Sequence, residues 1–212
     1  MLKSDNTVIN RRNFFTTASG FFVGSALFHL SSYLSFSLPT SQKVNEDFSV
    51  DESDWIEKST LAKDLSNYFG QGYSCAESLL MVSLRYLDKP EELVWAASGF
   101  GGGLYHKDLC GFLTGGTIAI GLASGMVKKS RREAKEYCGD LVKQYWKWWT
   151  ARSSLHCREI RTEGTSSGVC RNLGLLSAAK IEDLIKPIKN KAKDNPLAFC
   201  GFCNPEQPSF RS

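Results

Sequence analysis

Cysteines are the residues of this chain best suited to chemistry, because the thiolate form of cysteine acts as a nucleophile, a metal ligand or a redox group. The 212 residues include seven cysteines but only three histidines. A closed set of disulfides would leave one of seven thiols unpaired, and a chain of this length does not need disulfides to build a core. The cysteines therefore predict a reactive or metal-binding site.

The stretch 98–126 is organised around Cys110. Four glycines precede this thiol, at Gly99, Gly101, Gly102 and Gly103, and the uncharged apolar segment 111–127 follows it. Glycines allow the backbone to approach another backbone or a ligand closely. Cys110 is either the centre of a site or a small hydrophobe in a tightly packed helix. Segment 111–127 is short and glycine-rich for a membrane span, which favours a buried central helix.

Cys75 is predicted to occupy the first position of a helix. Ser74 and Glu77 have the spacing of a capping box that opens such a helix. The partial positive charge of a helix N-terminus favours thiolate over thiol. Cys75 is therefore a candidate nucleophile or metal ligand, with packing as the alternative.

Four further cysteines form two sequence pairs. Cys157 and Cys170 flank a turn-rich loop and could clamp a metal or form a disulfide, and His156 could ligate or relay a proton. Cys200 and Cys203 form a Cys-x-x-Cys pair without the strand–helix–strand context of a thioredoxin-like site. Asn204 stands where c-type haem attachment needs histidine, so no c-type haem is expected. The pair is then half of a metal site or a redox dithiol.

The apolar periodicity predicts an all-α fold, a compact bundle of five or six helices around the central glycine-rich helix. Residues 153–174 are expected to be irregular, and Cys138 is expected to be structural. The aromatic face Leu141, Tyr145, Trp148 and Trp149 is expected to be a core seam rather than a cofactor wall. The predicted helices are 55–69, one opening at Cys75, one from Pro90 through Ala97, 111–127, one from Ser130 to about Arg152, and one from Ser177 to about Lys191 interrupted by Pro187.

The N-terminal residues resemble a twin-arginine export signal. Arg11 and Arg12 precede an uncharged apolar run over 14–38. This resemblance implies export of a folded protein to the periplasm or the outer face of the cytoplasmic membrane. No Ala-x-Ala site is visible, so the signal is either cleaved elsewhere or kept as an anchor. The expected divisions are a signal segment (1–38), a linker (39–54), the helical cysteine-containing domain (55–195) and a tail (196–212).

Taken together, the motifs 72–78, 99–103 and 110–116 with Cys157 and Cys170 resemble the redox-active family named for its C_GCAxxG_C_C pattern. The resemblance implies a helical domain related to split-Soret cytochrome c, an exported electron-transfer protein with haem and an iron–sulfur centre. The family cysteines fall on Cys75, Cys110, Cys157 and Cys170. Phe112 replaces the usual alanine, and the haem-attachment motifs of that cytochrome are absent.

The leading hypothesis is an exported redox protein that binds an iron–sulfur cluster through cysteine thiolates and passes electrons to a redox partner protein or a membrane electron carrier. In this hypothesis Cys75 and Cys110 form an inner pair that Cys157 and Cys170 close from the loop, while Cys200 and Cys203 are further candidate ligands. The alternatives are thiol–disulfide exchange and a zinc- or disulfide-stabilised binding module. A net charge of +4 without long runs excludes a dedicated nucleic-acid surface, whereas a homodimer stays open.

Overall fold

The computed structural model describes residues 48–68, 71–127, 130–162 and 167–194. The predicted export signal, most of the predicted linker, and Cys200 and Cys203 lie outside these residues. The described part is all-α, as predicted, and its closest approach to a sheet is an isolated antiparallel bridge between Leu109 and His156. Its helices are α1 (Val50–Lys58), α2 (Thr60–Tyr68), α3 (Cys75–Tyr86), η1 (Glu91–Phe100), η2 (Gly103–Lys107), α4 (Gly111–Ser124), α5 (Arg131–Thr150), α6 (Cys157–Ile160) and α7 (Ser167–Asp194).

The predicted helix over 55–69 is two helices, which corrects the sequence reading. α1 begins earlier than expected, at Val50, where Ser49 and Glu52 form a capping box. It ends at Ser59, which has extended backbone. The buried Glu182 carboxylate of α7 accepts hydrogen bonds from the Ser59 hydroxyl (2.7 Å) and the Leu61 N–H (2.9 Å). The Ser59 hydroxyl in turn accepts from the Ala62 N–H (3.1 Å), so Glu182 and Ser59 together satisfy two free N–H groups at the start of α2 and fix the break.

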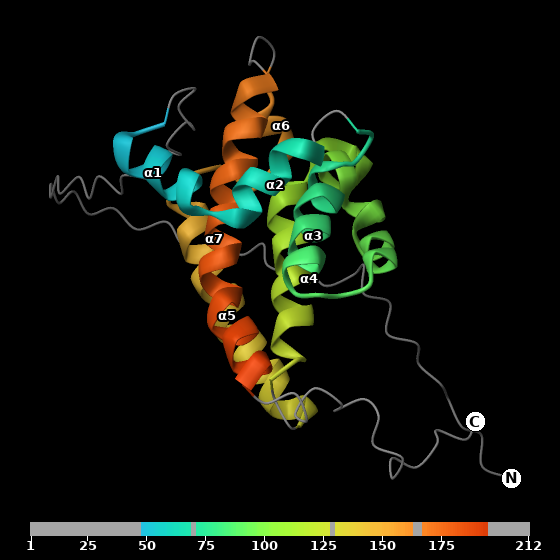
Figure 1. Cartoon of the computed structure of the whole chain (residues 1–212). Helices are drawn as coiled ribbons and strands as arrows, with labels where there is room; N and C mark the ends of the chain where they lie inside the picture. The colour runs from blue at the N-terminus through green and yellow to red at the C-terminus, as the bar shows by residue number, and fades with distance from the viewer. Residues whose placement is uncertain (1–47, 69–70, 128–129, 163–166, 195–212) are drawn as a thin grey trace, which may run out of the picture. The chain divides into compact units, whose positions relative to one another are not determined.

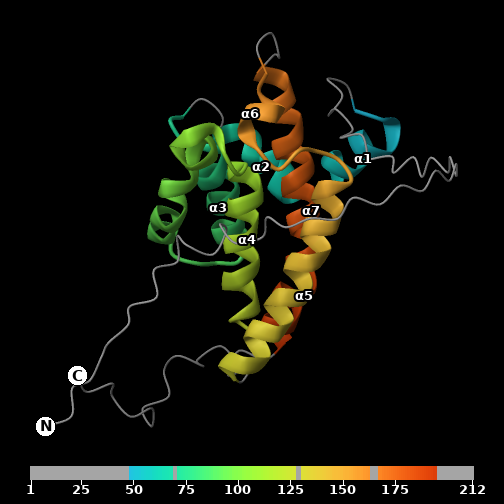
Figure 2. The same cartoon turned by 180° about the vertical axis from the view of Figure 1, so that it is seen from behind.

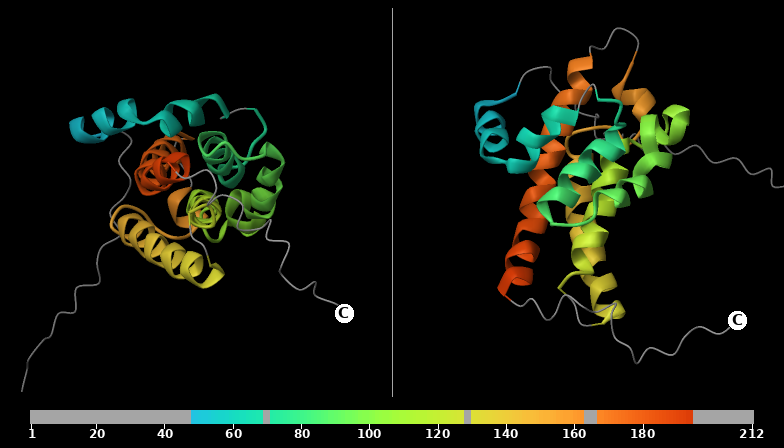
Figure 3. Two further views of the ribbon diagram at one scale, coloured as in Figure 1. Left: turned by 60° about the horizontal axis from the view of Figure 1, so that its bottom comes forward. Right: turned by 45° about the vertical axis from the view of Figure 1, so that its right-hand side comes forward.

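α4 is the central helix, as its sequence predicted. It contacts α3, α5, α7 and η1, and both views in Figures 1 and 2 show it running beside α7. Figure 3 shows α3, α4 and α7 end-on, with α2 crossing them. No helix of the described residues is long and apolar enough to span a membrane. Most of α4 is buried, and its glycines Gly111, Gly115 and Gly116 lie directly against neighbouring helices.

The aromatic face of α5 is a core seam, as predicted. Tyr145 and Trp149 are fully buried, and Trp148 stacks on Tyr145 with 5.7 Å between ring centroids. The Tyr145 hydroxyl donates to the Phe112 carbonyl of α4 (3.1 Å), which ties the seam to the central helix. Burial raises the pKa of Tyr145, so this hydroxyl keeps its proton and stays a donor.

Two predictions for the C-terminal part were wrong. Residues 153–174 are not irregular throughout, because α6 occupies 157–160 and α7 begins at Ser167. Pro187 does not interrupt the last helix, which continues to Asp194. Leu184, Ile185 and Ile188 around this proline are buried, so their burial outweighs the hydrogen bond that proline cannot donate.

Candidate functional site

The four cysteines of the predicted site lie at the beginnings of four helices. α3 begins at Cys75, Cys110 is the N-cap of α4, α6 begins at Cys157, and Cys170 lies in the first turn of α7. Figure 1 shows α3, α4 and α7 starting at the same, upper end, where α6 also lies. The helix starts predicted for Cys75 and Cys110 are confirmed. Cys157 and Cys170 were expected on an irregular loop and instead belong to helices.

A short pairing of two distant segments holds Cys110 next to the start of α6. The Cys110 N–H donates to the Leu155 carbonyl (2.8 Å), and the Cys157 N–H donates to the Asp108 carbonyl (2.6 Å). These bonds flank the bridge between Leu109 and His156. The backbone of Cys110 is thereby joined to that of the Cys157 segment, a connection that nothing in the local sequence pattern signals.

Two glycines make room for the cysteines. A Cβ on Gly111 would lie 3.1 Å from the Cβ of Cys75, so α4 begins directly against the start of α3. A Cβ on Gly103 would lie 2.8 Å from the Cβ of Cys157, and Gly103 also has a φ of +70°. The close approach that the glycine-rich stretch predicted is therefore present on both sides of Cys110.

Burial keeps the thiols of Cys110 and Cys170 in their neutral form. Cys110 is 5% exposed and Cys157 6%, while Cys75 and Cys170 are half-buried. Burial raises the pKa of Cys110 to about 12, and the N–H groups of Phe112 and Leu113, which donate to its sulfur, lower it only in part. Burial likewise raises the pKa of Cys170 to about 11. Without a ligand that takes up negative charge, these thiols stay protonated at neutral pH.

Neighbouring cysteines help to raise the pKa values of Cys75, Cys110 and Cys170. The pKa of Cys75 is raised by burial and further by Cys157, while a hydrogen bond from the Gly102 N–H and the charge of Arg161 lower it. Cys75 in turn raises the pKa of both Cys110 and Cys170. The tertiary structure has therefore gathered all four predicted cysteines into one electrostatically coupled group.

Sequence reasoning missed the partner of His156. Its Nδ1 lies 2.5 Å from the Asp108 carboxylate, on the segment that leads into Cys110. The two residues are 48 positions apart, and no motif joins them. Because Nδ1 of His156 is bound to the Asp108 carboxylate, the imidazole ring is held in one orientation next to Cys157 in the chain.

The remaining cysteine in the described residues lies apart from this group. Cys138 is on α5, where it is half-buried and packs against the hydrophobic core. All five cysteines that the structure describes are free thiols. In the same residues, no three His, Cys, Asp or Glu side chains are placed to hold one metal ion.

A known protein family has a sequence model that matches the part of the chain containing these four cysteines. Residues 73–184 match the family described as "Putative redox-active protein (C_GCAxxG_C_C)", a match that covers more than half of the chain. The chain belongs to this family. No curated protein and no solved structure matches the chain.

The C_GCAxxG_C_C match contains all four cysteines of the coupled group and ends before Cys200 and Cys203. Its description makes redox activity the general function of the chain. It names neither a metal nor a partner. The type of redox chemistry must therefore be argued from the residues themselves.

Proposed function

We propose that this C_GCAxxG_C_C protein binds an iron–sulfur cluster through the thiolates of Cys75, Cys110, Cys157 and Cys170 and exchanges electrons with a partner. The observation that carries the proposal is the convergence of four helix beginnings, each with a cysteine, on one end of the helical domain. Four cysteine thiolates are the usual ligand set of such clusters. When bound, the cluster would accept one electron from a donor and pass it to an acceptor.

The residues around the four thiols suit this role. Backbone N–H groups of Gly102, Phe112 and Leu113 donate to the sulfurs of Cys75 and Cys110. Hydrogen bonds to the sulfurs and low solvent exposure are two of the factors that set a cluster's potential. Binding would displace the thiol protons, so the raised pKa values make cluster binding tighter as the pH rises.

A single zinc ion and an iron–sulfur cluster place different demands on the positions of the cysteine sulfurs. Zinc bonds of about 2.3 Å require the sulfur ligands to lie within about 4 Å of each other. No such group of three ligands is preformed in the described residues. A cluster instead distributes its four cysteines over several iron atoms, so its ligands lie farther apart.

Metal and sulfide analysis tests this proposal. Protein purified without oxygen is expected to contain iron and acid-labile sulfide and to absorb visible light. Cys110→Ser is expected to lose most of both while keeping its far-ultraviolet circular dichroism. Cys138→Ser is the matched control, since Cys138 is a half-buried cysteine outside the group, and it is expected to retain both. Full iron in Cys110→Ser, or stoichiometric zinc in the wild type, would refute the proposal.

Thiol–disulfide exchange is the second candidate, favoured by the free, half-exposed thiol of Cys75 beside the Gly102 N–H and Arg161. The Cys75 thiolate would attack a partner's disulfide, forming a mixed disulfide as the old S–S bond breaks and a partner thiolate leaves. A second cysteine would then attack the Cys75 sulfur, releasing the other partner thiol and leaving an internal disulfide. The raised pKa of Cys75 leaves little of it in the reactive thiolate form at neutral pH, which ranks this function below cluster binding. A metal-free protein that reduces disulfides would reverse the order.

The site of action is proposed to be outside the cytoplasm. Arg11 and Arg12 and the uncharged run after them support export in the folded state, which would allow a cofactor to be inserted before transport. Replacing both arginines by lysine is expected to leave the protein in the cytoplasm, as measured by cell fractionation. Unchanged export of that variant would contradict this route.

A further inference from the structure

Exposed apolar side chains are concentrated on one part of the molecule. Seven large hydrophobic side chains are exposed among the described residues, and five of them lie between positions 73 and 105. These five are Tyr73, Leu93, Trp95, Leu104 and Tyr105. Trp95 is 75% exposed and Tyr105 74%. Aromatic side chains grouped on a surface are typical of protein interaction sites.

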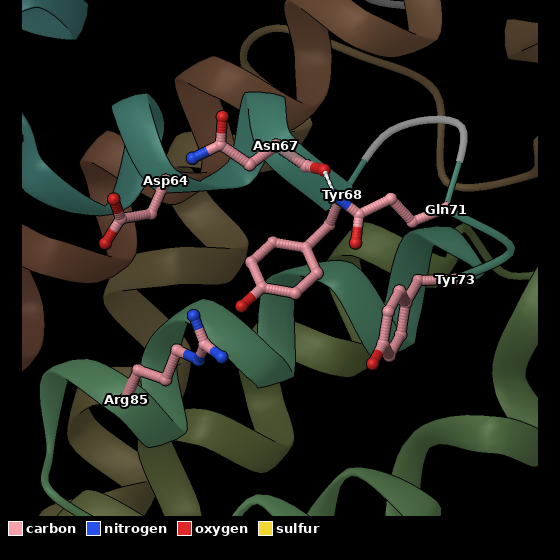
Figure 4. Close-up of a pocket in the computed structure, with 6 residues that line it drawn as sticks. All are labelled: Asp64, Asn67, Tyr68, Gln71, Tyr73 and Arg85. Atoms are coloured by element: carbon pink, nitrogen blue, oxygen red, sulfur yellow. Dashed lines mark hydrogen bonds between the residues drawn. The ribbon is translucent and has the colours of Figure 1, made fainter.

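The surface beside Trp95 is hollowed. A hollow of about 570 Å³ is lined by Tyr73, Val94, Trp95 and Met81 and by the carboxylates of Glu77, Glu91 and Glu92. A second hollow of about 270 Å³ shares Gln71 and Tyr73 with the first and adds Asp64, Asn67, Tyr68 and Arg85. Figure 4 shows this second hollow, with the Tyr73 ring at one edge and Arg85 below Tyr68. We call the two hollows together the acidic groove.

The charge of the acidic groove is negative. Its lining carries four carboxylates, at Asp64, Glu77, Glu91 and Glu92, and one guanidinium, that of Arg85. Arg85 already pairs with Glu91 at 2.8 Å. The groove therefore combines aromatic rings with an excess of negative charge, and both features attract a cation.

The acidic groove adjoins the cysteine group. The Glu77 carboxylate accepts hydrogen bonds from the Ser74 N–H (2.8 Å) and the Ser98 hydroxyl (2.5 Å). Ser74 is the N-cap of the helix that begins at Cys75. The Tyr105 hydroxyl donates to the Ser98 carbonyl (3.2 Å), which places the exposed Tyr105 ring next to the same residues. A partner in the groove would thus contact residues that hold Cys75 in place.

The backbone near Tyr105 is strained. Leu104 and Tyr105 both have φ values of 58° in the left-handed region, and their side chains are exposed. This conformation is disfavoured for residues other than glycine, because the Cβ approaches the backbone too closely. Their exposed side chains gain little from burial in return. Strain of this kind is concentrated at sites that bind ligands or partners.

We infer that the acidic groove is the docking site for a basic segment of a partner protein, in which a lysine or arginine flanked by apolar residues inserts between Tyr73 and Trp95. Charge complementarity decides the occupant, because the carboxylates would repel an acidic partner and an anionic lipid surface alike. The claim that the docked partner is the one that exchanges electrons rests on the proposed function. The binding of a basic segment to the groove can be tested independently of the cluster.

The test is calorimetric titration of the full-length wild-type protein, purified without oxygen, with short capped peptides of lysine, leucine and alanine. A second peptide carries glutamine in place of lysine. The lysine peptide is expected to bind saturably and about tenfold more tightly than the glutamine peptide, with an affinity that falls as salt rises. Trp95→Ala is expected to weaken binding about tenfold, and Glu92→Gln to weaken it and reduce its salt dependence.

Trp146→Ala is the matched control, because Trp146 is an exposed tryptophan (45%) on α5, outside the groove. It is expected to leave peptide binding unchanged. Equal affinity for the two peptides, no saturable binding, or an equal loss in Trp146→Ala would overturn the inference. Self-association of the protein that Trp95→Ala abolishes would assign the groove to a second copy and would also overturn it. None of these results depends on iron content, so they leave the test of the proposed function separate.

Discussion

Replacement of Gly115 by alanine tests whether the glycines of α4 are there for close helix packing. A Cβ at this position would lie 2.5 Å from the carbonyl oxygen of Ala76 and 2.9 Å from its Cα, both backbone atoms of α3. Ordinary contacts between heavy atoms are about 3.5 Å, so the two helices must separate by about 1 Å. A flexible side chain could move away, but the backbone of α3 cannot move alone.

The expected cost follows from two opposing effects. Overpacking a well-packed core by one methyl group costs about 3 kcal/mol when backbone must move. Replacing glycine by alanine inside a helix returns about 1 kcal/mol. The free energy of unfolding of Gly115→Ala should therefore fall by about 2 kcal/mol. For a domain of this size the melting temperature should fall by about 4–8 °C.

Gly121→Ala on the same helix is the control. A Cβ on Gly121 would meet no atom within 4 Å, so only the helix-propensity gain applies. This variant should be more stable by about 1 kcal/mol and melt about 2–4 °C higher. Thermal and urea unfolding followed by far-ultraviolet circular dichroism measure both. A Gly115→Ala protein as stable as wild type, or a Gly121→Ala protein destabilised to the same extent, would refute the close packing of α3 on α4.

Two further predictions concern the start of α3. Burial raises the pKa of Glu77, but hydrogen bonds from Ser98 and Ser74 outweigh it and hold that pKa below its usual value of 4.5. The free energy of unfolding should therefore fall as the pH drops below 4.5, and that of Glu77→Gln, measured by urea unfolding, should depend less on pH there. The same pH dependence in wild type and Glu77→Gln would contradict the lowered pKa of Glu77. Ser74→Ala and Ser130→Ala each remove an N-cap and should each cost about 1 kcal/mol. Only Ser74→Ala should also lower iron content, because Ser74 caps the helix that begins at Cys75; equal iron loss in both would refute that link.

Much of the fold was predictable because its signals are local. The capping box at Ser74 and Glu77 depends on residues three apart, and it placed Cys75 at a helix start as observed. The absence of charge over 111–127 identified the central helix α4. The apolar and aromatic side of α5 predicted that Tyr145 and Trp149 would be buried. Each of these patterns is read within one helix.

The failures came where distant residues override local preference. The break at Ser59 depends on the Glu182 carboxylate of α7. The continuation of α7 through Pro187 depends on the burial of neighbouring apolar side chains, whose free energy exceeds the cost of one missing hydrogen bond. Glu182 is 123 positions from Ser59, and the apolar residues beside Pro187 do not show from the sequence alone that they are buried.

The sequence by itself identified the candidate residues for chemistry, since thiols and glycines are recognisable by type and spacing, and their ordered combination indicated the family. Only the tertiary structure decided that four cysteines from separate helices form one coupled group, and that Asp108 holds His156 beside it. The acidic groove beside them is also a product of packing, because its aromatic and acidic side chains come from α2, the turn that follows it, α3 and η1. Residue type is a local property, whereas distance between residues far apart in the chain is fixed only when the helices pack.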